Sequence, residues 1–139
     1  MIKKTIDYVD YNGVKRSEDF YFNLNEAELT EMELSTKGGM SSMLEDIVAA
    51  DNTQKIIDVF KKLILSAYGE KSDDGRRFIK SEELAVGFSQ TEAYVKLFME
   101  LATDTKAAID FVNGVMPANI EEIKEEDIKQ LSVVEPKNE

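Results

Sequence analysis

The chain has 139 residues, enough for one domain, and its 28 acidic residues against 17 basic ones give a net charge of -11. General binding to nucleic acid requires a basic face that releases counterions from phosphates, so this charge argues against that class of protein. The absence of cysteine and histidine excludes disulfides, thiol nucleophiles and the commonest metal ligand.

The chain also lacks the marks of secretion and of membrane insertion. Residues 1–7 carry two lysines, but no apolar segment follows them as it does in a signal peptide. No apolar run approaches the roughly 20 residues that cross a membrane as a helix. We therefore expect a soluble cytoplasmic protein that has neither a membrane nor nucleic acid as a partner.

A β-hairpin is expected over residues 2–22, because two stretches rich in β-branched and aromatic residues flank Asn12-Gly13, a strong hairpin signal. A two-residue loop would put Ile6 and Phe20 on opposite faces. A three-residue loop with Gly13 in the left-handed conformation gathers five apolar side chains on one face: Ile2, Ile6, Tyr8, Phe20 and Phe22. We predict this second loop, and its apolar face should pack on helices.

Two helices are predicted on either side of a glycine pair. Asn25 is the expected N-cap of the first helix, because acidic residues crowd the turn that follows and interact favourably with the helix dipole. This helix should end near Thr36, since Gly38-Gly39 breaks it. The second helix runs over residues 41–50, where apolar side chains recur at helical spacing: Met43, Leu44, Ile47 and Val48.

A third helix begins after Asp51 or Asn52, and Gly69 is well placed to end it as a C-cap. Its apolar stripe consists of Ile56, Phe60, Leu63, Ile64 and Ala67. The segment that follows contains Asp73-Asp74-Gly75, but a calcium loop aligned on that glycine would have Ser81 in place of its bidentate glutamate. A lone glycine also fails as a phosphate loop. We interpret the segment as a turn before a short extended piece over 77–79, with no metal or cofactor.

Three further helices are predicted up to Pro117. Ser81 should cap a short helix over 82–88, and residues 89–92 have the pattern of a capping box that opens the next helix. Thr103 or Asp104 caps the last helix, which Gly114 and Pro117 end. The apolar faces of the two longer helices are formed by Tyr94, Leu97, Phe98 and Leu101, and by Ala108, Phe111, Val112 and Val115.

Together these elements predict an α+β fold that is mostly α-helical, with an N-terminal β-hairpin packed on a bundle of about five to six short helices. Residues 1–117 should form a single globular domain, with the hairpin over 2–22 and the helical part over 25–117. Residues 118–139 contain seven acids and three lysines and no aromatic residue. We expect this acidic tail to be partly helical or disordered.

Methionines supply the candidate binding residues, since flexible methionine-rich surfaces suit a partner that must be held adaptably. Met40 and Met43 lie next to Gly38-Gly39, so we predict that they form an accessible apolar patch with Leu44 and Ile47. The alternative interpretation is that the methionines fill the core at helical spacing. No pair of carboxylates suggests shifted pKa values, so the sequence predicts no catalytic residue.

Several short segments follow one another in a characteristic order, at residues 22–29, 32–39, 68–72, 75–80, 90–94, 97–104 and 111–114. Through them the chain resembles the tail assembly chaperones of long-tailed phages that infect Gram-positive bacteria. The resemblance spans most of residues 1–117 and rests on the number and order of the segments, since none is a catalytic signature. The acidic tail lies outside it.

The resemblance implies a protein that is not an enzyme and needs no cofactor. Such chaperones bind the aggregation-prone tape measure protein in the host cytoplasm, keep it soluble and help to recruit tail tube subunits, and they are absent from the mature virion. Many also have a longer product, made by programmed frameshift, whose extra domain contacts the tail tube protein. Self-association into rings or spirals is compatible with exposed apolar patches.

Residues near the end of the chain bear on the frameshift. Pro136-Lys137-Asn138 can be encoded by CCA AAA AAC, which contains the slippery heptamer A AAA AAC. Ordinary codon choice is the alternative explanation, and the gene sequence distinguishes the two.

Two other classes of function stay open at this stage. An acidic protein that mimics DNA, or a related inhibitor of phage origin, would need carboxylates spaced like phosphates along one face, whereas the acids here cluster in 26–33 and 121–127. A small hydrolase that uses aspartate or glutamate with magnesium would respond to added metal.

Overall fold

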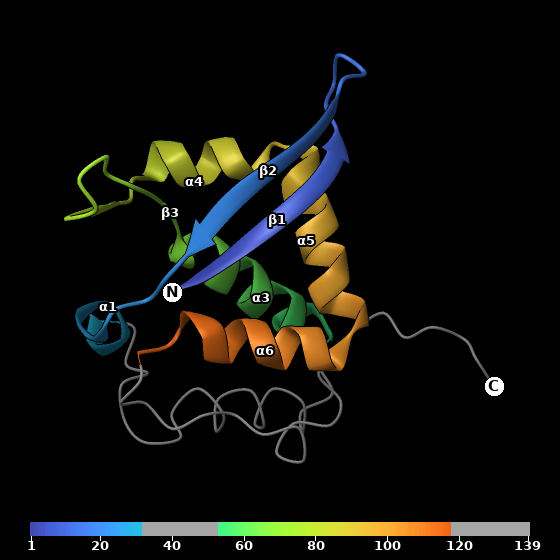
Figure 1. The fold of residues 1–139 in the computed structure, drawn as a ribbon. Coiled ribbons are helices and arrows are strands. Elements are labelled where there is room, and N and C mark those ends of the chain that lie inside the picture. Colours follow the sequence, from blue (N-terminus) through green and yellow to red (C-terminus); the bar gives the residue numbers. More distant parts are fainter. Residues whose placement is uncertain (32–52, 118–139) are drawn as a thin grey trace.

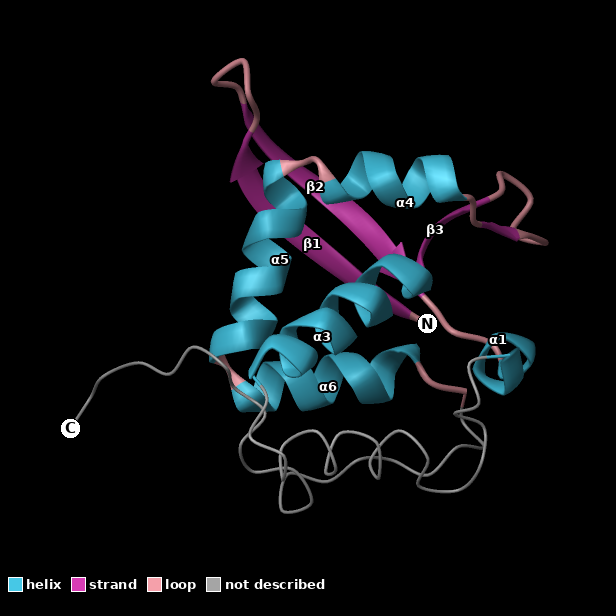
Figure 2. Ribbon diagram, turned by 180° about the vertical axis from the view of Figure 1, so that it is seen from behind, coloured by secondary structure: helices cyan, strands magenta, loops and turns pink. Residues whose placement is uncertain are grey.

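A four-stranded antiparallel sheet, with helices packed on one side of it, makes up the fold in this computed structural model (Figures 1 and 2). The structure describes residues 1–31 and 53–117. The predicted α+β fold with an N-terminal hairpin and short helices is therefore confirmed. The second helix predicted over 41–50 and the acidic tail lie outside the described residues, so the domain boundary at residue 117 stays a prediction.

The hairpin has the predicted three-residue loop. Strands β1 (Ile2–Val9) and β2 (Lys15–Phe22) pair from Ile2↔Phe22 to Val9↔Lys15. Gly13 has a φ of 81° and donates its N–H to the Asp10 carbonyl, while the Asp10 N–H bonds to the Val14 carbonyl, both at 2.9 Å. This register buries Ile6 and Phe22 and packs the other three predicted residues, Ile2, Tyr8 and Phe20, against the core.

Strands β3 (Tyr68–Lys71) and β4 (Phe78–Ile79) extend the sheet beyond what the sequence predicted. β3 joins β2 through two residue pairs, Tyr21↔Gly69 and Phe22↔Tyr68. The prediction of Gly69 as a helix C-cap is therefore wrong, because the chain passes directly from helix to strand. The turn before β4 is confirmed, with Gly75 at a φ of 75°.

Three of the predicted helix caps are confirmed. Helix α1 (Glu26–Glu31) begins after Asn25, whose Oδ1 accepts the Glu28 N–H at 2.8 Å, and the Glu28 carboxylate accepts the Asn25 N–H at 2.9 Å. Ser81 caps α4 (Glu82–Ser89) by accepting the N–H of Leu84. Asp104 caps α6 (Thr105–Val115) in the same way.

Two predicted boundaries are wrong. Ser89 is the last residue of α4 rather than a cap, and the hydroxyl of Thr91 accepts the Tyr94 N–H to cap α5 (Glu92–Thr103). Gly114 lies inside α6 instead of ending it. A side chain at that glycine would begin 2.8 Å from the Cδ1 atom of Ile2, so the glycine allows the start of β1 to approach the helix.

Helix α3 (Thr53–Ala67) and the two helices α5 and α6 close the core against the sheet. The Tyr68 and Phe88 rings stack with centroids 4.4 Å apart and nearly parallel planes, which joins β3 to α4. The helical stripes predicted from the sequence face this core, and their buried members are Phe60, Leu63, Ile64, Ala67, Leu97, Leu101, Ala108, Phe111, Val112 and Val115.

The ammonium group of Lys80 links three segments of the chain beside α1 through hydrogen bonds. It donates to the Asn23 carbonyl at 2.6 Å and to the Ser66 carbonyl at 2.8 Å, and it pairs with Glu28 at 2.7 Å. These partners lie after β2, near the end of α3 and in α1. Because the Lys80 side chain is only 20% exposed, removing its charge would leave carbonyl groups short of a donor.

Replacing Gly69 by alanine should destabilise the protein by about 1–3 kcal/mol, because the new Cβ would lie 2.7 Å from the Phe78 ring and 2.9 Å from the Ile79 carbonyl oxygen. Gly87→Ala is the control, since its Cβ would meet nothing within 4 Å and alanine gains up to about 1 kcal/mol in a helix. Urea unfolding measures both. Equal stability of the two variants would contradict the close approach.

Lys80→Met should cost about 1–3 kcal/mol of unfolding free energy, since it keeps much of the aliphatic stem but leaves the three oxygen partners without their shared donor. Lys106→Met removes a charge from the exposed pair with Asp110 and should change stability by less than about 1 kcal/mol. Thermal and urea unfolding compare the stabilities of the two variants. A Lys80 variant as stable as its control would show that the contacts of Lys80 contribute little to stability.

Candidate functional site

The binding patch predicted at Met40, Met43, Leu44 and Ile47 lies outside the described residues, so the structure leaves that prediction untested. The described part of the chain has other exposed apolar side chains. They gather mainly on the hairpin and on α5, and comprise Met1, Val9, Tyr11, Val14, Val95 and Met99, with Val86 on α4. Exposed groups of this kind mark surfaces that can bind a partner.

Strand β1 is the edge of the sheet, and among residues 1–31 and 53–117 no other strand pairs with its outer side. In an antiparallel pair, every second residue turns its N–H and C=O toward the neighbouring strand. Because Asp10 is bonded to Val14, the even-numbered residues of β1 face β2. The backbone groups of the odd-numbered residues therefore point outward, at Lys3, Thr5, Asp7 and Val9.

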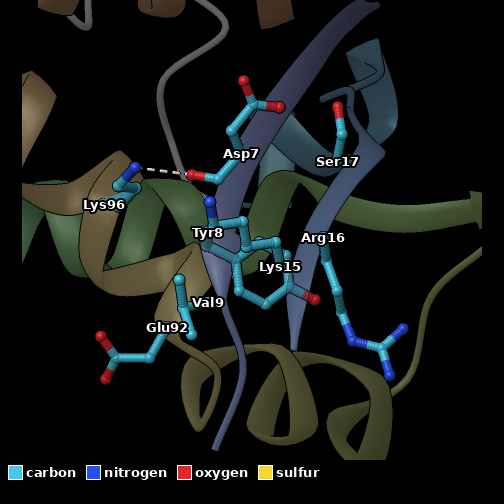
Figure 3. A pocket seen from close by; sticks show the side chains of 8 residues that line it. All are labelled: Asp7, Tyr8, Val9, Lys15, Arg16, Ser17, Glu92 and Lys96. Atoms are coloured by element: carbon cyan, nitrogen blue, oxygen red, sulfur yellow. Dashed lines mark hydrogen bonds between the residues drawn. The ribbon is translucent and has the colours of Figure 1, made fainter. Parts of the chain in front are cut away.

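A lysine from α5 reaches this outer edge. Lys96 donates to the backbone carbonyl of Asp7 at 2.6 Å (Figure 3). This contact places the ammonium group of an α5 residue on a backbone group of β1. The carbonyl that Lys96 contacts is one of those the register turns outward, which supports the assignment of the edge.

Three polar contacts align α5 with the hairpin. Glu92, Lys96 and Glu100 are spaced four residues apart and so lie on one face of the helix. Glu92 accepts the Tyr11 hydroxyl at 2.8 Å, Lys96 bonds to Asp7, and Glu100 pairs with Lys4 at 3.3 Å. Exposed contacts of this type contribute little free energy each, so they position α5 without sealing it against the strand.

An open groove of about 470 Å³ lies between the β1 edge and α5. We call it the β1–α5 groove; its lining residues are Lys4, Thr5, Ile6, Asp7, Val95, Lys96, Leu97, Met99 and Glu100. A second hollow shares Asp7 and Lys96 with the groove and is also lined by Val9, Lys15 and Arg16 of the hairpin (Figure 3). The groove thus combines outward backbone groups, apolar side chains, lysines and carboxylates.

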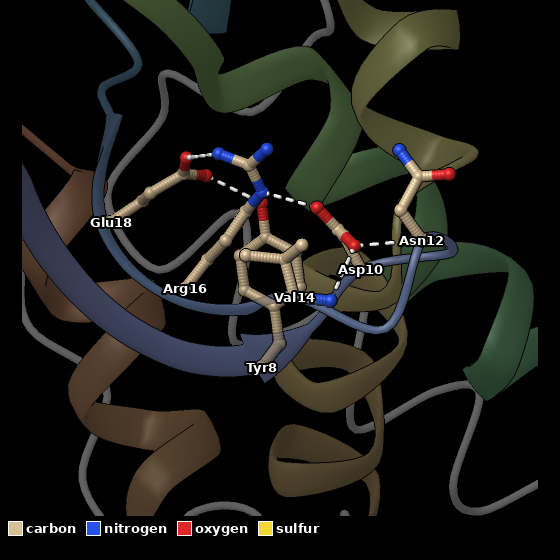
Figure 4. A network of polar contacts seen from close by, with 6 residues as sticks. All are labelled: Tyr8, Asp10, Asn12, Val14, Arg16 and Glu18. Atoms are coloured by element: carbon tan, nitrogen blue, oxygen red, sulfur yellow. Dashed lines mark hydrogen bonds and ion pairs between the residues drawn. The ribbon is translucent and has the colours of Figure 1, made fainter.

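The hairpin tip beside the groove is held by a network around Asp10 (Figure 4). Asp10 accepts the N–H groups of Asn12 and Val14 through one oxygen and binds Arg16 at 2.6 Å through the other. The hydrogen bond from Arg16 and those from the backbone hold the pKa of Asp10 below its usual range.

Glu18 extends this network along β2. It pairs with Arg16 at 3.3 Å and accepts the Tyr8 hydroxyl, which raises the pKa of Tyr8. The network satisfies the polar groups of the tip locally, so Val9 and Val14 are held in place while remaining half exposed.

The groove is not acidic although the chain is acidic overall, since Lys4 and Lys96 match Asp7 and Glu100 in its lining. Lys3, Lys4, Lys15, Arg16 and Lys96 all lie on the hairpin or on the adjoining face of α5. Lys4 and Arg16 have carboxylate partners, whereas Lys3, Lys15 and Lys96 form no salt bridge with a described residue. The groove is therefore suited to a partner that carries some negative charge.

In the Asp73-Asp74-Gly75 segment, the side chain of Asp74 stabilises the turn itself. The Asp74 carboxylate accepts the Ser72 hydroxyl at 2.8 Å and the Arg76 N–H at 3.0 Å, which lowers the pKa of Asp74. Among the described residues, no group of three or more carboxylate, histidine or cysteine side chains is arranged to hold a metal ion.

These features define a small α+β protein whose hairpin and α5 present a strand edge and a groove of mixed polarity. The family model for phage tail assembly chaperones matches residues 1–139, and the chain belongs to that family. The family predicted from the sequence is thereby confirmed, but the prediction that the acidic tail lies outside the resemblance is wrong, because the match includes residues 118–139. No curated protein and no solved structure matches the chain in the corresponding comparisons. In the described part of the chain, no helix has the length and apolar character needed to cross a membrane.

Asp10→Asn should make the protein less stable at neutral pH, because asparagine can still accept the two backbone N–H groups but cannot pair with Arg16. The folded pKa of Asp10 is lowered, so its contribution is present above the unfolded pKa and is lost as pH falls through the folded pKa. The stability gap between the two proteins should close in that acidic window.

Urea unfolding across a pH series measures this gap. Asp73→Asn is the control for net charge, since it removes a carboxylate from the other turn, where the structure shows no hydrogen bond to that side chain. A gap for Asp10→Asn that persists unchanged at acidic pH would contradict a role for the ion pair.

Proposed function

We propose that this protein binds the tape measure protein of its phage during tail assembly and keeps it soluble in the host cytoplasm until the tail tube forms around it. The observation that carries the proposal is the family match over the whole chain. A net charge of -11 supports it, because high charge keeps a complex with a sticky client in solution.

The mechanism is reversible capture without catalysis or cofactor. A chaperone that uses no nucleotide must bury apolar client surface at equilibrium, and binding the unassembled client lowers the concentration that can aggregate. The exposed apolar side chains of the hairpin and α5 are a surface for such capture. Polymerisation of the tube then competes the client away, and the chaperone is absent from the mature virion.

Recruitment of the tail tube protein is the second part of the proposal. It would be carried by a longer product made by frameshifting near Pro136-Lys137-Asn138, whose extra domain contacts the tube protein. Met40, Met43, Leu44 and Ile47 remain a proposed second contact for the client. Self-association and a siphovirus of a Gram-positive host also belong to the proposal.

An acidic DNA mimic is the less favoured alternative. Its surface would present carboxylates in a phosphate-like row, whereas the described hairpin interleaves them with Lys3, Lys4, Lys15 and Arg16. The two functions differ in their salt dependence, since binding by a DNA mimic weakens sharply with salt and apolar capture does not.

Co-expression with the tape measure protein from the same genome tests the proposal. We expect the tape measure protein to be insoluble alone, soluble with this chain, and recovered with it when either protein is purified. An unrelated acidic protein of similar size is the control for a general effect of charge.

If the tape measure protein stays insoluble, the experiment is repeated with the frameshifted product. Solubility only with the longer product would assign client capture to that form, and insolubility with both would refute the proposed function.

A further inference from the structure

We propose that the β1–α5 groove binds an extended segment of the client polypeptide, which adds to the outer edge of β1 as a further strand. The inference rests on the proposed function and deepens it by naming the surface and the chemistry of the client segment. That segment alternates apolar and polar residues and carries a carboxylate that pairs with Lys96.

The backbone of β1 provides the first reason. Lys3, Thr5, Asp7 and Val9 turn their N–H and C=O groups outward, and no proline interrupts the row. An unpaired row of this kind is a template for another strand, which proteins usually protect with charges, bulges or a covering segment. Addition of a peptide strand to such an edge is a recurring mode of recognition.

Lys96 supplies the second reason, because it protects this edge at one point and by a reversible contact. Its ammonium group bonds to a carbonyl, not to a carboxylate, and it sits on a flexible four-carbon stem. When an incoming strand donates a backbone N–H to the Asp7 carbonyl, it replaces Lys96 as the donor. Lys96 is then released to pair with a carboxylate of the client. The Asp7 carbonyl keeps a donor throughout, so the exchange leaves no backbone group unsatisfied.

The apolar side of the groove supplies the third reason. Val95 and Met99 are four residues apart on α5, so they lie on one face of the helix, and they are 43% and 44% exposed. Side chains of an added strand alternate between its two faces. Those on the helix side would cover Val95 and Met99, and the flexible methionine can adapt to different apolar residues.

Charge distinguishes this edge from the outer edge of β2. The hollow between β2 and β3 is lined by Glu18, Asp19 and Glu70, and its lysine, Lys71, lies over the Tyr21 ring at 4.5 Å. A client segment that carries a carboxylate would be repelled there. The β1–α5 groove instead has two lysines, Lys4 and Lys96, against two carboxylates, Asp7 and Glu100. Lys96 and the neighbouring Lys3 have no carboxylate partner among the described residues, so they can pair with the client.

Two matched pairs of variants test the groove with the co-expressed full-length tape measure protein as the probe. Thr5→Pro removes an outward N–H while the bonds to β2 are kept, and Thr5→Val keeps that N–H but also loses the hydroxyl contact with Asp19. Val95→Glu puts a charge into the groove, and Val86→Glu puts the same charge on the exposed side of α4.

We expect Thr5→Pro and Val95→Glu to weaken tape measure binding by about tenfold or more, and their controls to bind as the wild type does. Each variant is first shown to be folded by circular dichroism and thermal unfolding. Hydrogen–deuterium exchange supplies a second readout that does not depend on any substitution. The peptide that covers β1 should gain slowly exchanging amides in the complex, while the N-terminal half of β2 should not.

Each other outcome overturns the inference in a distinguishable way. If the wild type and the groove variants bind the tape measure protein equally and β1 gains no protection, the proposed function stands and the docking site is wrong. If the wild type does not bind the tape measure protein at all, the proposed function fails and the docking site fails with it. Protection of β1 that appears without the client and disappears on dilution would assign the edge to a second copy of this chain.

Discussion

The register of the hairpin is the constraint on which both the core and the candidate binding surface depend. The left-handed backbone of Gly13 closes a three-residue loop and places the even-numbered residues of β1 against the helices. A slip by one residue would turn Ile6 toward solvent. It would also turn the outward amides of Thr5 and Asp7 toward β2, so a single turn determines what the sheet buries and what it offers to a partner.

The helices hold this sheet by two different means. Aromatic packing under β2 and β3 is extensive and buried, with Phe22 fully covered and the Tyr68 and Phe88 rings stacked. Strand β1 is also anchored through its inner face, where Ile6 is buried in the same core as Leu97 of α5. Along its outer edge, the contacts with α5 are polar and exposed, and they are made by Glu92, Lys96 and Glu100.

Local rules explain which parts of the fold could be predicted from the sequence. The caps at Asn25, Ser81 and Asp104 depend on a side chain and an amide three residues away, and the hairpin loop depends on one glycine, so short patterns were sufficient. The extended piece at β4 was predicted, but the place of β3 in the sheet could not be, because the pairing of Gly69 with Tyr21 joins residues far apart in the chain. A glycine after a helix is usually a cap, and only the nearness of Phe78 reveals its other role.

The binding surface was the part least accessible to sequence analysis. Alternation in β1 predicted its buried face, but the position of Lys96 on Asp7 is a contact between residues 89 apart. The sequence predicted exposed methionines near Gly38-Gly39, outside the described residues. Among the described residues, the exposed methionines are Met1 and Met99. The family, by contrast, could be inferred from the order of short segments, since that order does not depend on tertiary contacts.

The approach of Ile2 to Gly114 has a consequence for how the chain is made. The hairpin is synthesised first, yet the groups that bury its apolar face, on α5 and α6, emerge from the ribosome much later. Contacts of such long sequence separation slow folding. Until the helices have been synthesised, the apolar face of the hairpin is exposed and prone to aggregation. During its own translation, this chaperone passes through a state with an exposed apolar surface, and the acidic residues of α1 that follow the hairpin supply early charge against aggregation.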